Sequence, residues 1–135
     1  LRANAGLEEA LAYALTGAVR AQDLRWILGA AWGGGEAERR VTLEWTRERW
    51  DALVERLPSF GWGSKARLPG RVGAFCDEEG RDAARRLFEE KAPDGGGRHL
   101  RLGVEKADQC IALRRSATPA FRVAAGKPAS REEAR

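Results

Sequence analysis

Apolar residues recur at helical spacing along most of this sequence, and short clusters of glycine and proline interrupt the pattern. The first such stretch, residues 7–15, places five leucine and alanine side chains on one helical face. Glycines at positions 33–35 and the Pro-Gly segment 93–97 separate later stretches, because neither residue is favourable inside a helix. The chain is thereby restricted to a series of short amphipathic helices, each of which must bury one face.

The pattern predicts about six helices, joined by short connections. The first four span about residues 7–15, 19–32, 36–57 and 69–75. The fifth runs from an N-cap at Asp77 to the 93–97 segment, and the sixth spans about 98–115. Residues 59–70 are predicted to form an ordered loop with Phe60 and Trp62 as hydrophobic anchors.

The composition favours an all-α fold. Ala, Leu, Arg and Glu dominate, while Val and Ile are scarce and Tyr occurs once, so β structure has little to build on. Short connections between successive helices predict antiparallel helix pairs that form part of an α–α superhelix, a HEAT/armadillo-like solenoid. We expect one domain over residues 1–122 and a flexible C-terminal tail over 123–135.

The charge balance does not point to a nucleic-acid partner. The net charge is +4 and the pI about 9.6, but basic pairs such as Arg85-Arg86 and Arg114-Arg115 are interleaved with acids. A solvated arginine-rich surface is the favoured interpretation. No apolar run reaches the roughly 20 residues that a membrane span requires, so no membrane contact is predicted.

Two cysteines are too few for a disulfide scaffold. Cys76 and Cys110 both fall among apolar positions, which favours a pair of small buried core residues. A disulfide between them would need an oxidising compartment and adjacent Cβ atoms, and it stays an alternative. The compartment, cytoplasm or periplasm of a bacterium, is unknown from the sequence.

No pattern in the chain indicates a catalytic, cofactor-binding or metal site. His99 is the single histidine, and the zinc-peptidase signature H-E-x-x-H is absent. The glycine triplets lack the lysine and the preceding strand of phosphate-binding loops. Asp23 and Asp51 are interpreted as anchors of hydrogen bonds or ion pairs between helices.

Three stretches carry a resemblance to a known family: residues 18–23, 44–58 and 75–112. Their order and spacing are similar to those in the C-terminal helical domain of zinc-dependent alanyl/puromycin-sensitive (gluzincin) aminopeptidases. The resemblance implies that zinc lies in an upstream thermolysin-like domain, where two His and a Glu hold the metal and a second Glu activates water. The helical domain would then close the substrate chamber without taking part in catalysis.

The resemblance also implies partners and tentative site residues. The partners are the upstream catalytic and helical domains of the same polypeptide and a peptide substrate. Arg20, Arg47, Lys65 and Arg67 are candidates for facing that substrate, by charge alone. The absence of Met and the start at Leu1 agree with a fragment.

If further helices precede the first one, residues 7–14 would expose an apolar patch and self-association would be possible. The alternative function is a stand-alone helical-repeat adaptor that binds a protein partner.

Overall fold

The computed structural model describes residues 4–125 and contains no strand among them. Six α-helices and two 3-10 segments follow one another: α1 (Ala5–Ala14), η1 (Ala21–Asp23), α2 (Leu24–Trp32), α3 (Glu36–Glu48), α4 (Trp50–Arg56), η2 (Lys65–Ala74), α5 (Glu78–Glu90) and α6 (Gly97–Ala125). The all-α prediction is confirmed, and the HEAT/armadillo-like superhelix stays a prediction.

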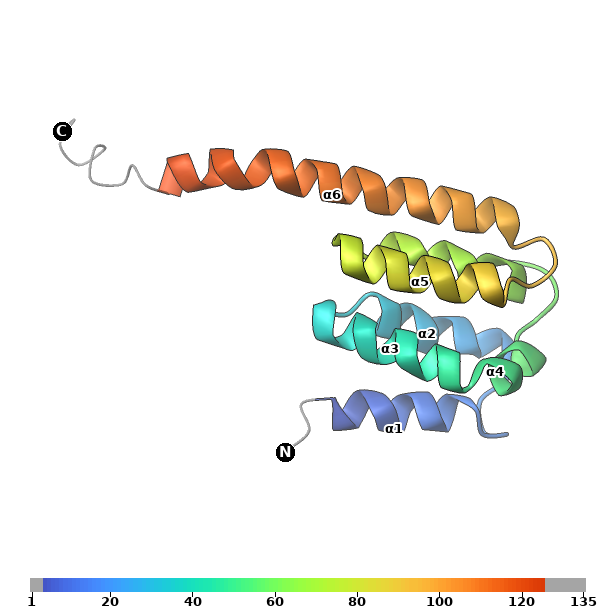
Figure 1. The fold of residues 1–135 in the computed structure, drawn as a ribbon. Coiled ribbons are helices and arrows are strands. Elements are labelled where there is room, and N and C mark those ends of the chain that lie inside the picture. Colours follow the sequence, from blue (N-terminus) through green and yellow to red (C-terminus); the bar gives the residue numbers. More distant parts are fainter. Residues whose placement is uncertain (1–3, 126–135) are drawn as a thin grey trace.

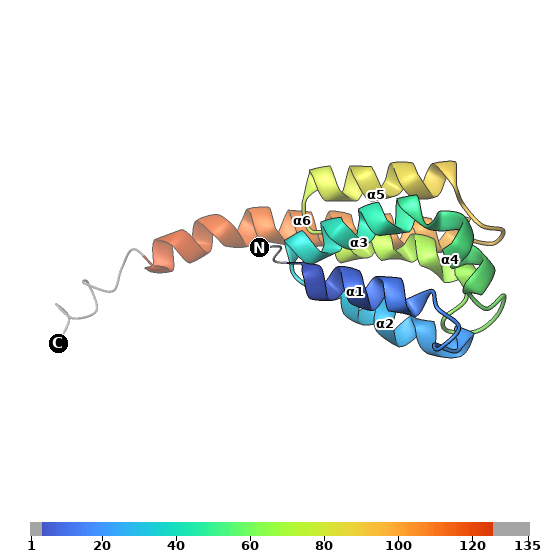
Figure 2. The same ribbon diagram turned by 90° about the horizontal axis from the view of Figure 1, so that it is seen from below.

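The helices lie side by side in a stack that begins with α1 and ends with α6 (Figure 1). α2 and α3 form the layer next to α1, and α5 and η2 lie between that layer and α6. α6 is the longest element, and its C-terminal half projects beyond the stack (Figure 2).

Two aromatic pairs tie neighbouring layers of the core together. The ring of Trp32 at the end of α2 meets Phe75 edge to face, with centroids 6.0 Å apart. Trp50 on α4 lies 6.1 Å from Phe88 on α5. Each pair buries large apolar surface and adds a favourable ring geometry, so the stack is held by contacts between residues far apart in the sequence.

η2 packs closely against α6. A Cβ added to Gly103 of α6 would lie 2.8 Å from the backbone oxygen of Gly70. A Cβ at Gly73 would lie 3.0 Å from the Lys106 side chain and 3.2 Å from the Gly103 oxygen. A side chain at Gly103 would have to displace the backbone of η2, and one at Gly73 would press on α6, so glycine lets the two elements pack this closely.

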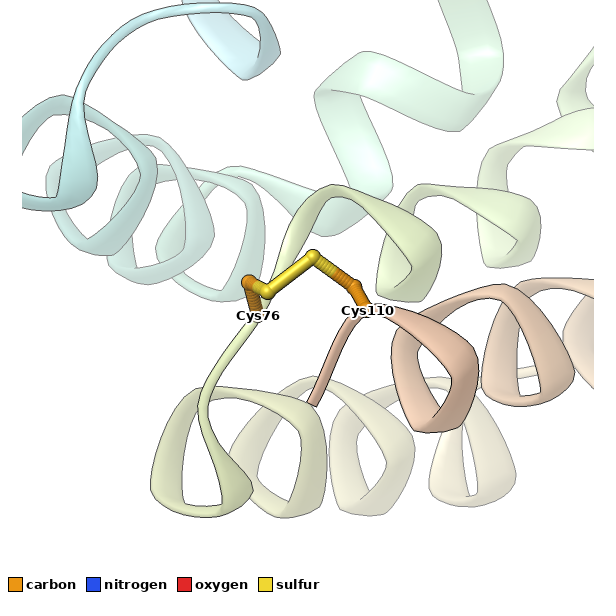
Figure 3. The surroundings of a disulfide bond; sticks show 2 residues. All are labelled: Cys76 and Cys110. Atoms are coloured by element: carbon orange, nitrogen blue, oxygen red, sulfur yellow. A yellow bond between two sulfur atoms is a disulfide. The ribbon is translucent and has the colours of Figure 1, made fainter. Parts of the chain in front are cut away.

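A disulfide bond joins Cys76 to Cys110, which corrects the prediction of two unbonded core cysteines. Cys76 lies between η2 and α5 rather than in a helix, and Cys110 lies on α6 (Figure 3). Both are partly exposed, and their Cα atoms are 5.2 Å apart. Local apolar neighbours suggested burial, but the close packing of η2 on α6 brings the two sulfurs together across 34 residues of sequence.

The start of α5 agrees with the predicted N-cap. The Asp77 carboxylate accepts a 2.9 Å hydrogen bond from the Gly80 amide, and it also accepts one from Arg40 of α3. Arg40 contacts Glu79 as well, and Arg81 of α5 pairs with Asp108 of α6 at 2.7 Å. These ion pairs link α3 to α5 and α5 to α6 at the surface of the stack.

Two predicted boundaries were wrong in the middle of the chain. The helix expected over 36–57 changes direction at Arg49, whose ψ of 21° is not helical, so α3 and α4 are separate. The loop expected over 59–70 already enters η2 at Lys65. Pro69 lacks a backbone donor and Gly70 and Gly73 follow it, which favours a 3-10 segment over an α-helix there.

The C-terminal helix is longer than predicted. α6 continues past residue 115 to Ala125, through an alanine-rich sequence that favours helix on either side of Pro119. Residues 123–125 of the expected tail thus belong to α6, and the rest of that tail lies outside the described residues. The predicted turn before α6 is confirmed, since Gly95 has a φ of +79° that favours glycine.

The glycine contact makes a quantitative prediction. Gly103→Ala should destabilise the chain by about 1–3 kcal/mol, because the new methyl group meets backbone atoms of Gly70 that cannot move aside. Gly97→Ala on the same helix is the matched control, since a Cβ there meets no atom within 4 Å. Urea unfolding followed by circular dichroism measures both. Equal stabilities of the two variants would contradict the close approach of η2 and α6.

The disulfide gives a second prediction. A bond that closes a loop of 34 residues should stabilise the chain by about 3–4 kcal/mol. The Cys76→Ser/Cys110→Ser variant is expected to unfold at correspondingly lower urea than the oxidised chain. A reductant should lower the midpoint of the parent chain and leave that of the double variant unchanged. If reductant leaves the urea midpoint of the parent chain unchanged, the disulfide does not contribute to its stability.

Candidate functional site

The described residues offer no site for a bound metal. No group of three or more His, Cys, Asp or Glu side chains among residues 4–125 is arranged to hold an ion. Both cysteines are in the disulfide, so neither supplies a thiol that could pair with His99. Within the described part of the chain, no helix is both long and apolar enough to cross a membrane.

The four basic residues proposed to face a substrate are spread over the molecule. Arg20 is exposed before η1 and pairs with Asp23 at 2.8 Å, and Arg47 of α3 pairs with Glu44 at 3.7 Å. Lys65 begins η2, and the Arg67 guanidinium stacks 4.5 Å over the Trp62 ring. Of the four, Arg67 alone lines one of the cavities described below. Their role toward a substrate stays a prediction.

The two aspartates do not connect helices as predicted. Asp23 bonds to Arg20, three residues earlier, so its ion pair stays within one short segment. Asp51 is exposed in the first turn of α4. The sequence placed both beside apolar residues, but their side chains lie on the solvent side of the stack.

One cavity of about 580 Å³ lies on the exposed face of α2. We call it the arginine groove, and its lining residues are Arg25, Trp26, Gly29, Ala30, Trp62 and Arg71. Trp26 and Trp62 are exposed at 66% and 77%, unusually high for tryptophan. Sequence reasoning overlooked this site, although Trp26 falls outside the apolar stripe of its helix and could have signalled an exposed ring.

A second cavity, of about 700 Å³, lies between α1 and the α3–α4 pair. We call it the outer groove. Its lining is apolar at Ala12, Leu15, Val41, Trp45 and Ala52, and Glu8, Glu44, Glu48 and Arg49 complete it. This is the region where the sequence predicted an apolar patch beside the first helix.

A comparison with known families decides the class of the chain. Residues 2–109 match the model of the ERAP1-like C-terminal domain. The chain belongs to this family. No curated protein matches it.

The family assignment confirms the resemblance found in the sequence. The match covers both grooves and every helix from α1 to α5, and it ends within α6. An ERAP1-like C-terminal domain is consistent with the C-terminal part of an aminopeptidase, which accounts for a stack of helices without a metal site among its described residues.

Proposed function

We propose that this chain is the non-catalytic C-terminal part of a zinc aminopeptidase and that it shapes and closes the substrate chamber. The observation that carries the proposal is the family match over residues 2–109. The parent would hold zinc in an upstream domain, where two His and a Glu bind the metal and a second Glu activates water. This chain would contribute a wall to the chamber and no group to the chemical step.

The outer groove supports the further proposal that upstream helices of the same polypeptide pack beside α1. α1 stands at one end of the stack, where its next neighbour in a longer helical array would lie (Figure 1). The groove there exposes apolar side chains that a packed helix would cover. In the separated chain, a second copy would take the place of the missing helices.

The catalytic part of the proposal is tested with the purified chain and its coding region. We expect no hydrolysis of an alanyl chromogenic substrate above the buffer rate, with or without added zinc. Sequence upstream of Leu1 should encode H-E-x-x-H with a further Glu downstream. Robust hydrolysis by the chain alone would overturn the non-catalytic role. A start codon directly before Leu1 would instead favour the stand-alone adaptor.

The chamber role is tested by substrate length in the parent enzyme. If these helices limit the chamber, a parent that ends before Leu1 should still hydrolyse the small chromogenic substrate while losing its preference among peptides of different length. A truncated enzyme with an unchanged length preference would contradict the chamber role.

The outer groove predicts concentration-dependent dimers of the separated chain. Ala12→Glu places a charge on the apolar lining beside Glu8, and it should weaken dimers by about tenfold or more. Ala10→Glu is the matched control, since Ala10 is exposed on the same helix and does not line the groove. Sedimentation over a range of concentrations measures both variants. Equal effects of the two substitutions would mean that the groove is not the contact.

A further inference from the structure

The arginine groove and the cavity that adjoins it at Arg67 are lined by cations that have no carboxylate partner in the described part of the chain. Arg25 of α2 stacks 4.6 Å over Trp26, and Arg67 of η2 stacks 4.5 Å over Trp62. A guanidinium held over an indole ring keeps N–H donors available for other partners. Among the described residues, neither Arg25 nor Arg67 forms an ion pair with a carboxylate.

Arg71 occupies the centre of this region. It lines the groove and also two neighbouring cavities, one with Arg67 and Ser64 and one with Arg39 and Lys106. Its guanidinium is partly buried, and burial lowers the pKa of Arg71 from its ordinary value because the charge loses water. Within the described part of the chain no carboxylate compensates that charge.

The cavity that Arg71 lines together with Arg39 and Lys106 is also rich in hydrogen-bond donors. Its volume is about 340 Å³, and glycines of α2 and η2 form part of its wall. The buried Nε1 of Trp32 and the buried Nε of Arg39, two residues that line it, have no hydrogen-bond partner among the described residues. Buried donors of this kind are uncommon, and they add to a region that is rich in donors and poor in acceptors.

The three adjoining cavities share lining residues and one sign of charge. Five cations line them: Arg25, Arg39, Arg67, Arg71 and Lys106. No Asp or Glu of the described chain is among their lining residues. The exposed rings of Trp26 and Trp62 add apolar surface at the open end. Such a surface complements a ligand that carries several carboxylates next to apolar groups.

We infer that the arginine groove binds an extended acidic peptide segment through its side-chain carboxylates. Glu or Asp side chains of the segment would accept hydrogen bonds from Arg25 and Arg71 in the groove and from Arg67 in the cavity that adjoins it. An apolar side chain between them would lie against Trp26 and Trp62. This inference concerns the surface of the chain itself and does not depend on the aminopeptidase proposal.

The test uses the full 135-residue chain and a fluorescein-labelled peptide of alternating Glu and Leu residues. The peptide is amidated, so no terminal carboxylate takes part. We expect saturable binding in fluorescence anisotropy, weakened by added salt because the contacts are partly exposed. Arg25→Gln/Arg67→Gln should weaken it by about tenfold or more. Both side chains are exposed, and circular dichroism should show an unchanged fold.

The matched control is Arg98→Gln/Arg101→Gln. It removes the same charge from two exposed arginines of α6 that do not line the three cavities. Its affinity for the peptide should stay within about twofold of that of the parent chain. Arg71→Gln, tested separately, should also weaken binding, because it removes the cation that all three cavities share.

Several results would overturn the inference. Equal loss of affinity in the groove variant and the α6 control would show that net charge alone attracts the peptide. Equally tight binding of a matched Gln-Leu peptide would exclude carboxylate recognition. Equally tight binding of a single-stranded oligonucleotide, with the same sensitivity to Arg25→Gln/Arg67→Gln, would identify a general polyanion site instead. Absence of binding would also refute the proposal.

Discussion

The contact between η2 and α6 at Gly70 and Gly103 is the arrangement on which most of the fold depends. Backbone meets backbone there, and a side chain on Gly103 would collide with the Gly70 backbone, with its Cβ 2.8 Å from the Gly70 oxygen. That approach sets the position of Phe75, which follows η2 and packs against Trp32 in the core. It also brings Cys76 within bonding distance of Cys110. A shift of α6 by the width of a methyl group would disturb all three features.

Covalent and ionic links reinforce the same end of the stack. The disulfide fixes the start of α5 to α6, and Arg81 connects these helices again through Asp108. Arg40 extends the connection to α3 through Asp77, which also caps α5. At the other end of the stack α1 packs on α2 and α3, and the outer groove stays open beside it. The disulfide and ion pairs thus lie toward the α6 end of the stack, and the open groove lies toward the α1 end.

The fold separates charges that are mixed in the sequence. Basic and acidic residues are interleaved along the chain, and the sequence shows no cluster that accounts for the net charge of +4. In the structure, five cations line the three cavities around Arg71, while Glu8, Glu44 and Glu48 line the outer groove. The two grooves therefore differ in the charge that they present, a difference that the interleaved charges of the sequence do not show.

The sequence by itself determined the class of the fold, most of the helices and the family. Apolar stripes with a period of 3.6 residues, and the Gly or Pro residues that end them, are set by residues close together in the chain. The apolar faces of α1 and α2, the N-cap at Asp77 and the turn at Gly95 could therefore be predicted from the local sequence. The tertiary structure alone decided the break at Arg49, the Cys76–Cys110 bond and the gathering of Arg25, Arg67 and Arg71 around adjoining cavities. These features arise where segments far apart in the sequence come together, and no local pattern of residues specifies which segments will meet.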